Sequence, residues 1–559
     1  MRNVNIFEDY ENAVVDTVES YRAGHPGTTY KFSEIPNREI DGIPISVTRA
    51  EDGELEVTFI PDGHLLAIGA TRSGKTTGYV LPTINVLMRK KNKPSLILSD
   101  PKQELYNATA KGLEAEGYNV KIIDFTNDYR YSDCWNPLTK IFRLYQKYLH
   151  VEDEVSVVRT GRGYRNRFRG VTYENQKTLD LAIAEAKTGL FDEVEKNVTA
   201  LTAGIIPVCN TKDPFWEVSA LDMLRSILYA MLEDSESGLI TEETFSFDTV
   251  VKVFDSFSDS HSPYDNGYFT HRDLEKSKAY QLAQKCFLEQ ASNTRRCIAS
   301  SFASKANIFR DTAIRRVTSN CSFEMSELDG DRPTAVFLSY KDEENLHYDV
   351  ISMFLSNLYT ELIGISRKKG KPLSRPFYFL LDEFGNLPKF GSFDKVISAC
   401  GARNVWFLIV LQSYAQLYNI YGKETAEIIK DNLNTHVFFG TNNPQTKQEF
   451  SDECGKKTII APTSALNGSG ESINRYDKET VPLVPVSALS KIESGTCYVT
   501  QMRENVLLSR MERSYTCPEF QNEPASIKDR TPTVNFADPK YSFVIPKYNA
   551  ARRHVFDFD

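Results

Sequence analysis

The sequence has few of the features that mark exported or membrane-spanning chains. Its nine cysteines form no CxxC pair and show no metal-ligand spacing, and their odd number does not suit a disulfide framework. The first residues contain no basic stretch followed by an apolar core, and no apolar run approaches the roughly 20 residues that cross a bilayer. We therefore expect a soluble chain in a reducing compartment, the cytoplasm.

The sequence also lacks an excess of positive charge. It has 66 lysines and arginines against 75 aspartates and glutamates, a net charge of −9. A protein that coats nucleic acid carries a basic footprint over a whole domain, so any contact with nucleic acid would depend on local basic patches. There is no internal repeat and no low-complexity tract, and 559 residues suffice for two to four globular domains.

Short apolar runs alternate with helical patterns in two parts of the chain, which predicts an α/β fold with a parallel sheet. The runs include HLLAIGA and SLILSD near the start, and FYFLLDE and VWFLIVLQ after residue 376. Between the two parts the pattern is mainly helical. The predicted organisation is a small β-containing segment at 1–60, a sheet domain from 61–137 and 331–515, an all-α insertion at 138–330 and an extended tail at 516–559.

The sequence GATRSGKT at 69–76 matches the pattern G-x-x-x-x-G-K-[ST]. Glycines let the backbone turn tightly, so that successive N–H groups and the N-terminus of the next helix face an anion. Lys75 would reach the terminal phosphates and the Thr76 hydroxyl would bind Mg²⁺. Pro82 should bend or end the following helix. The predicted ligands of ATP and Mg²⁺ are Gly69, Ala70, Thr71, Arg72, Ser73, Gly74, Lys75, Thr76 and Thr77.

An acidic pair follows a second apolar strand. In FYFLLDE, Asp382 comes after five apolar residues, at the strand end where open parallel sheets bind ligands. Asp382 would hold Mg²⁺ and Glu383 would orient the attacking water as a general base. The alternative is that the two carboxylates merely begin a loop.

Two further polar residues lie on or near the next strand. Gln412 follows VWFLIVL and would sense the terminal phosphate at the same sheet edge, or else it is an ordinary loop glutamine. Arg403, in GARN, would act as an arginine finger toward the nucleotide of a neighbouring subunit. Its alternative is a solvated surface arginine.

The remaining motifs narrow the class of nucleotide-binding protein. A guanine-reading NKxD motif and an LSGGQ signature are both missing. The set GATRSGKT, SDPKQELY at 99–106, CWNPL, DPFW and LLDEFGNLPKF followed by LQSYAQLYNIYG resembles the conjugative coupling proteins of type IV secretion systems, the TraG/TraD-like ATPases. The resemblance covers roughly residues 60–515.

This resemblance implies a RecA-like nucleotide-binding domain interrupted by an all-α domain, in a ring hexamer related to FtsK/HerA translocases. It also implies single-stranded DNA bound to a relaxase, or protein, as the cargo handed to the secretion channel. Members of the family usually begin with transmembrane helices, whereas only 68 residues precede this P-loop. We therefore expect recruitment to the inner face of the membrane through a separate anchoring subunit.

The stretch VVRTGRGYRNRFRG combines arginines with Tyr164 and Phe168, as single-strand-binding loops do. A solvated loop is the alternative, because charge runs often lie on wet faces. Trp216, at the head of an amphipathic helix, is expected in the core. The candidate DNA-binding arginines are Arg159, Arg162, Arg165, Arg167 and Arg169.

Three functions remain open from the sequence. The first is an ATP-hydrolysing coupling protein that moves DNA or a DNA–protein complex to a secretion channel. The second is a translocase on duplex DNA, and the third is a receptor whose affinity is switched by ATP with little hydrolysis. The acidic net charge favours the third only slightly.

Overall fold

The computed structural model describes residues 14–126, 129–160, 163–206, 208, 214–258, 267–341, 348–387, 389–466, 472–533 and 543. These residues form two compact units, the sheet unit and the helical unit. The sheet unit is drawn from Met1–Ile122, Met325–Asp342 and Leu358–Asp529, and the helical unit from Ile123–Glu324, Glu343–Asn357 and Arg530–Asp559. In the described part of the chain, no helix is long and apolar enough to cross a membrane.

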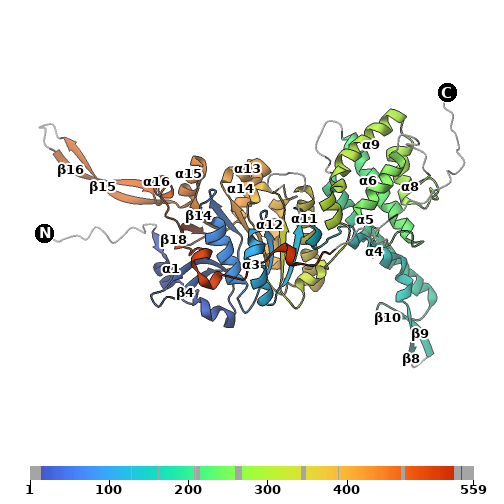
Figure 1. Ribbon diagram of the computed structural model, residues 1–559, viewed down its shortest axis with the longest axis horizontal. Helices are drawn as coiled ribbons and strands as arrows, with labels where there is room; N and C mark the ends of the chain where they lie inside the picture. Colours follow the sequence, from blue (N-terminus) through green and yellow to red (C-terminus); the bar gives the residue numbers. More distant parts are fainter. Residues whose placement is uncertain are drawn as a thin grey trace. The chain divides into compact units, whose positions relative to one another are not determined.

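A ten-stranded sheet is the centre of the sheet unit (Figure 1). From β14 to β11 its strands run parallel, whereas β17 is antiparallel to both of its neighbours. This confirms the predicted α/β fold class. In spatial order the strands are β1 (Val15–Thr17), β18 (Val506–Arg510), β17 (Thr496–Gln501), β14 (Thr435–Gly440), β5 (Leu65–Gly69), β13 (Val405–Leu411), β12 (Phe377–Leu381), β6 (Ser95–Ser99), β11 (Thr334–Ser339) and β7 (Asn119–Asp124).

The central strands are continuous apolar runs because both of their faces are buried. Every residue of β5, β6 and β12 is buried, as parallel strands covered by helices require. The register pairs Ile68 with Leu411, and Leu381 with both Ile409 and Ser99. The carboxyl ends of β5, β13, β12 and β6 therefore lie together at one edge of the sheet.

Helices connect the strands and lie alongside the sheet (Figure 1). Several have pronounced apolar faces that pack inward, as surface helices of globular proteins do. The helices of the sheet unit are α1 (Val18–Gly24), α2 (Leu81–Leu87), α3 (Glu104–Ala115), α12 (Phe393–Cys400), α13 (Tyr414–Tyr421), α14 (Lys423–Asn432), α15 (Pro444–Glu453), α16 (Val486–Leu489) and, from Leu358 onward, α11 (Tyr348–Lys369).

The N-terminal segment forms a three-stranded sheet from β2 (Thr29–Lys31), β3 (Ile43–Arg49) and β4 (Leu55–Ile60). This sheet is tied to β18, because the Ser509 hydroxyl donates to the Ile45 carbonyl at 2.6 Å. The sequence predicted an extended tail from 516 onward. Instead, Phe520 and Ile527 are buried, so the stretch to 529 packs onto the sheet unit through these side chains.

One hairpin was not anticipated from the sequence. Strands β15 (Lys456–Leu466) and β16 (Ser472–Pro482) pair antiparallel over 11 residues and extend away from the central sheet in Figure 1. The side chains of Ile459 and Ile460 at its base are exposed. The signal in the sequence was weak because neither strand shows a long alternation of apolar and polar residues.

The helical unit is built around α6, most of whose side chains are buried. At its end Asp234 forms an ion pair with Arg272 and accepts a hydrogen bond from the Tyr268 hydroxyl at 2.9 Å. Trp216 at its start is only half-buried, so the prediction that it belongs to the core was wrong. The main helices are α4 (Thr139–Leu149), α5 (Gln176–Ile205), α6 (Phe215–Ser235), α7 (Phe247–Ser258), α8 (Lys278–Ala283), α9 (Ser292–Ala306) and α10 (Thr312–Val317).

The sequence predicted an all-α insertion at 138–330. The helical unit also contains strands, so this prediction was incomplete. Strands β8 (Ser156–Thr160), β9 (Gly163–Phe168) and β10 (Val171–Tyr173) form a three-stranded antiparallel sheet. Phe168 anchors this sheet, because its ring packs with Val151 and Leu179. The arginine-rich stretch is thus a β-hairpin over a small core rather than a plain loop.

Candidate functional site: a phosphate-binding loop beside an acidic strand end

The GATRSGKT loop begins where β5 ends. A Cβ at Gly69 would overlap the Ser73 hydroxyl and the Lys75 stem, so a larger residue there would push these loop side chains aside. Gly74 has φ of +96°, a conformation that side chains disfavour. The Ala70 N–H donates to the Gly440 carbonyl at 2.7 Å, which ties the loop to the neighbouring strand β14.

The helix after the loop starts with a wide turn. Residues Thr76–Val80 form a π-helical turn, η2, which continues into α2. The sequence predicted that Pro82 bends or ends this helix. The helix runs past Pro82 to Leu87, so Pro82 does not end it. The Leu81 N–H bonds to the Thr76 carbonyl, five residues earlier, as in a π-helix. The turn before Pro82 therefore already lacks the regular α-helical hydrogen bonds that a proline would interrupt.

Lys75 is 7% exposed and its ammonium donates to the carbonyls of Gly69 and Ala70, the latter at 3.1 Å. Burial lowers the pKa of Lys75, and the nearby carboxylates of Asp382 and Glu383 partly oppose that shift. A buried ammonium held only by carbonyl oxygens gains from an anionic partner.

Asp382 stands next to Thr76, although 306 positions separate them in the chain. The Thr76 hydroxyl donates to Oδ2 of Asp382 at 3.0 Å. Burial raises the pKa of Asp382, while this hydrogen bond and the charge of Lys75 lower it. The contact exists because β5 and β12 flank β13 in parallel, so that their carboxyl ends share an edge.

Glu383 has a left-handed backbone, with φ of +53°, which is uncommon for a non-glycine residue and frequent at functional sites. Its Oε2 accepts a hydrogen bond from the Asn386 amide at 2.9 Å, and its Oε1 lies 3.9 Å from the Lys102 ammonium. The carboxylate is therefore held at the mouth of the pocket by two polar side chains.

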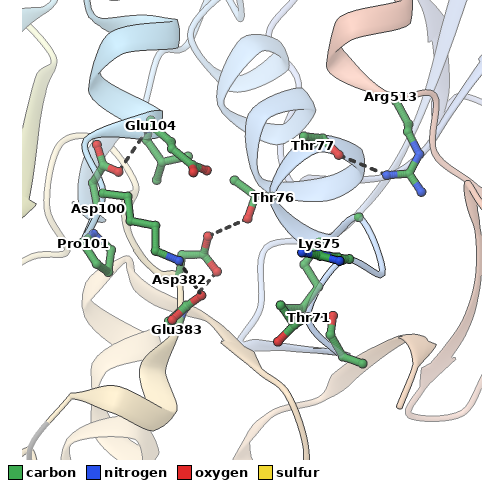
Figure 2. A pocket seen from close by; sticks show the side chains of 15 residues that line it. Thr71, Lys75, Thr76, Thr77, Asp100, Pro101, Glu104, Asp382, Glu383 and Arg513 are labelled. Atoms are coloured by element: carbon green, nitrogen blue, oxygen red, sulfur yellow. Dashed lines mark hydrogen bonds and ion pairs between the residues drawn. The ribbon is translucent and has the colours of Figure 1, made fainter. Parts of the chain in front are cut away.

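These groups line one pocket with a volume of about 300 Å³ (Figure 2). The P-loop forms one wall, and the residues after β6 and β12 form another. The lining residues are Ala70, Thr71, Arg72, Gly74, Lys75, Thr76, Thr77, Asp100, Pro101, Lys102, Glu104, Leu105, Asp382, Glu383 and Arg513.

Four charged lining residues had no role assigned from the sequence: Asp100, Lys102, Glu104 and Arg513. The first three come from SDPKQELY, where the only signal was a polar cluster after an apolar strand. The Asp100 carboxylate accepts the N–H groups of Leu105, at 3.1 Å, and Tyr106, at 2.7 Å. Burial raises its pKa to about 7. Arg513 follows the last strand of the sheet, and no local pattern marks it.

The donor set fits a small hard cation together with phosphate. A hydroxyl and a carboxylate meet at Thr76 and Asp382, and Mg²⁺ prefers such oxygen ligands, with waters and phosphates completing its shell. Within the described ranges, no group of three or more His, Cys, Asp or Glu side chains could hold a metal without such help. The Ser73 hydroxyl is buried and has no hydrogen-bond partner among the described groups. A hydroxyl that binds phosphate is expected to be unpaired in this way before the phosphate arrives.

Comparison with known proteins decides the family. Residues 37–482 match the family described as Type IV secretory system Conjugative DNA transfer. The chain belongs to this family. It is 22% identical over 411 residues to the protein VirD4 of Agrobacterium fabrum, which covers 72% of this chain and 51% of VirD4. It is 21% identical to a conjugal transfer protein TraG of Escherichia coli, over 72% of this chain and 57% of TraG. The chain thus spans about half the length of the curated relatives it matches.

Solved structures support the same fold. The plasmid coupling protein TrwB, in a structure with ADP and Mg²⁺, aligns with a TM-score of 0.54 at 14% identity, covering 90% of this chain and 94% of TrwB. Its unbound form aligns equally well, over 86% of this chain and 91% of TrwB. At this identity the likeness concerns the fold, a RecA-like P-loop domain with helices, which agrees with the fold predicted from the sequence.

Two predicted catalytic residues lie outside the pocket lining. Gln412 directly follows β13 at the predicted edge, but its N–H bonds to the Gln416 side chain at 2.8 Å and its carbonyl accepts the Thr441 hydroxyl at 2.9 Å. Arg403 lies before β13 starts, at the opposite edge of the sheet from the P-loop, and donates to the Ala399 carbonyl at 2.6 Å. Arg403 therefore does not serve the pocket of its own chain.

The described arginines of the candidate DNA-binding stretch divide between the two faces of the hairpin. Arg159 pairs across the strands with Tyr164, which is 74% exposed, and Arg165 and Arg167 lie on the opposite face. Arg169 forms an ion pair with Glu154 at 2.7 Å. Phe168 is buried, so the expectation that it stacks on bases was wrong. Arg162 lies outside the described residues.

Proposed function

We propose that this pocket binds ATP with Mg²⁺ and hydrolyses ATP. The observation that carries the proposal is the contact between Thr76 and Asp382, which joins the P-loop to the acidic end of β12. Lys75 and Glu383 line the same pocket, so a phosphate cradle, a cation site and a candidate base converge. The TrwB structures with ADP and Mg²⁺ and with an ATP analogue support this assignment by analogy of fold.

The chain's own residues have separable roles in this proposal. Lys75 would exchange the carbonyls of Gly69 and Ala70 for a terminal phosphate, which relieves the charge that burial now disfavours. Thr76 and Asp382 would hold Mg²⁺, which would supply positive charge to the phosphate oxygens during transfer.

Glu383 would accept the proton of the attacking water. Its hydrogen bond from Asn386 and the nearby Lys102 ammonium hold the carboxylate at the pocket, where a general base would have to lie. The left-handed backbone at Glu383 turns the chain sharply after β12, so that the side chain faces the pocket rather than continuing the line of the strand.

At the level of the cell, we propose a coupling protein of a conjugative type IV secretion system. Membership of the conjugative DNA transfer family supports this role. In this proposal the chain assembles as a hexamer, receives single-stranded DNA with its relaxase or a protein substrate, and passes it to the channel at the inner face of the membrane, docked through an anchoring partner. The exposed Arg159 and Arg167 of the β8–β9 hairpin are candidates for contact with DNA phosphates.

The test is ATP hydrolysis by the purified chain with no DNA, with single-stranded DNA and with duplex DNA. Lys75→Ala and Glu383→Gln should each abolish turnover, but only the first should also weaken ATP binding, because Glu383 acts after binding. Stimulation by single strands supports the coupling role, and stimulation by duplex alone would favour a duplex translocase. A wild-type assembly that binds ATP without hydrolysing it would replace the motor by an ATP-switched receptor.

A further inference from the structure

Arg513 comes from a distant part of the chain to reach the P-loop. It follows β18, and its guanidinium donates through Nη1 to the Thr77 hydroxyl at 3.1 Å and through Nη2 to the Ser494 hydroxyl at 2.6 Å. The same group lies against Gly74, at the place that a Cβ on that glycine would occupy. The guanidinium of Arg513 therefore packs in the space that the missing side chain of Gly74 leaves, and Arg513 lines the pocket.

The charge of Arg513 has no counter-charge in the described part of the chain. Its hydrogen-bond partners, Thr77 and Ser494, are neutral hydroxyls, whereas the nearby Arg510 pairs with Glu512 and Arg49 pairs with Glu519. A half-buried guanidinium presents five N–H donors in a planar fork that suits phosphate oxygens, and two hydroxyls use only part of that capacity. An anion in the pocket is the partner that this arrangement lacks.

The position of Arg513 tells which part of a nucleotide it would meet. Figure 2 shows Thr76 and Asp382 in contact on one side, and Arg513 bonded to Thr77 on the side away from Asp382. The cation site marks the terminal phosphates. A phosphate chain bound with its terminal end there would run past Thr77, and its nucleoside-proximal phosphate would then face the guanidinium.

We propose that Arg513 binds the α-phosphate of the nucleotide, with Ser494 and Thr77 holding the guanidinium in place. This inference rests on the proposed nucleotide site and adds to it a binding residue from the end of the sheet unit. Because ADP and ATP share the α-phosphate, Arg513 contributes to the affinity of both. A residue that senses the terminal phosphate, in contrast, distinguishes ATP from ADP.

The experiment measures the dissociation constants of Mg²⁺–ADP, a non-hydrolysable ATP analogue with Mg²⁺, and inorganic tripolyphosphate by calorimetry. Arg513→Ala should weaken all three by roughly 10- to 100-fold, the range for a lost charge-assisted hydrogen bond to phosphate. Arg513→Lys should recover part of the loss, because it keeps the charge but not the fork. Arg510→Ala, three residues earlier on an exposed side chain, is the matched control and should bind as the wild type does.

Other results would overturn the assignment. Unchanged affinity for ADP in Arg513→Ala would make Arg513 structural, and a loss confined to the ATP analogue would make it a sensor of the terminal phosphate. Weaker nucleotide binding with unchanged tripolyphosphate binding would place the contact on the nucleoside. If Arg513→Ala does not fold, Ser494→Ala, which releases one arm of the guanidinium, should still weaken ADP several-fold, and unchanged affinity there refutes the proposal. A wild-type chain that binds no nucleotide would instead refute the proposed function itself.

Discussion

Acidification should destabilise the sheet unit through His64, the residue that precedes β5. Its ring is buried, and its Nδ1 accepts the Phe407 N–H at 3.0 Å, so the neutral ring must carry its proton on Nε2. Nε2 lies 3.6 Å from the Cys400 sulfur. A second proton on the ring would have to displace the Phe407 hydrogen bond and would place a charge in an apolar setting.

Burial lowers the pKa of His64 from 6.5 to about 4. Because the unfolded chain takes up the proton first, stability is complete above the unfolded pKa and falls as the pH drops toward the folded one. At 1.36 kcal/mol per pKa unit, the full effect is about 3 kcal/mol, of which about 2 kcal/mol should be lost between pH 7 and pH 5.

The assay is urea unfolding between about pH 7 and pH 5, followed by tryptophan fluorescence. Of the three tryptophans, only Trp406 belongs to the sheet unit, and its ring lies 5.3 Å from that of His64, so Trp135→Phe and Trp216→Phe make the signal specific. His64→Asn keeps an acceptor for Phe407 but cannot titrate. The wild type should lose about 2 kcal/mol more than His64→Asn over this range. Parallel pH dependences would refute the reasoning.

Three further predictions test the packing of the site and of the helical unit. Gly69→Ala places a methyl group against the Lys75 stem and should weaken ATP binding about tenfold or more with little change in thermal unfolding, which calorimetry can check. Arg272→Met strands the buried carboxylate of Asp234 and should lower the unfolding free energy of the helical unit by about 3–5 kcal/mol; an unchanged denaturation midpoint would contradict the ion-pair argument. Phe168→Ala removes the anchor of the β8–β10 sheet, should cost about 3 kcal/mol locally and should speed proteolytic cleavage there, whereas equal cleavage rates would show that the anchor is dispensable.

The sequence was most informative where short-range patterns carry the physics. A glycine-rich turn between an apolar strand and a helix announces a phosphate loop, because the conformation depends on neighbouring residues. The carboxyl ends of parallel strands must share a sheet edge, so the sequence alone assigns Asp382 to the same edge as Thr76. The same rule placed Gln412 at that edge, yet it could not say which way the side chain turns.

Elsewhere the sequence was ambiguous because the deciding contacts are distant. The arginine-rich stretch at 159–169 has the composition of a solvated loop. Phe168 packs on Leu179, and this distant contact anchors the stretch as a hairpin. The end of the chain after 516 lacks periodicity, yet Phe520 is buried because the sheet unit offers it an apolar surface. Pro82 was expected to bend or end the helix, yet the helix continues from a π-turn through Pro82 to Leu87.

By itself, the sequence determined the α/β fold class, the P-loop, the acidic strand end and the resemblance to conjugative coupling proteins, since all of these follow from local patterns and linked motifs. Only the tertiary structure decided which groups surround the loop. Asp100 and Arg513 lie in the pocket because β6 and the end of β18 return to the same sheet, and no local pattern encodes that return. Neighbouring strands of this sheet are far apart in the sequence, so distance along the chain does not indicate distance in space. The complete set of pocket residues is therefore defined only by the folded sheet.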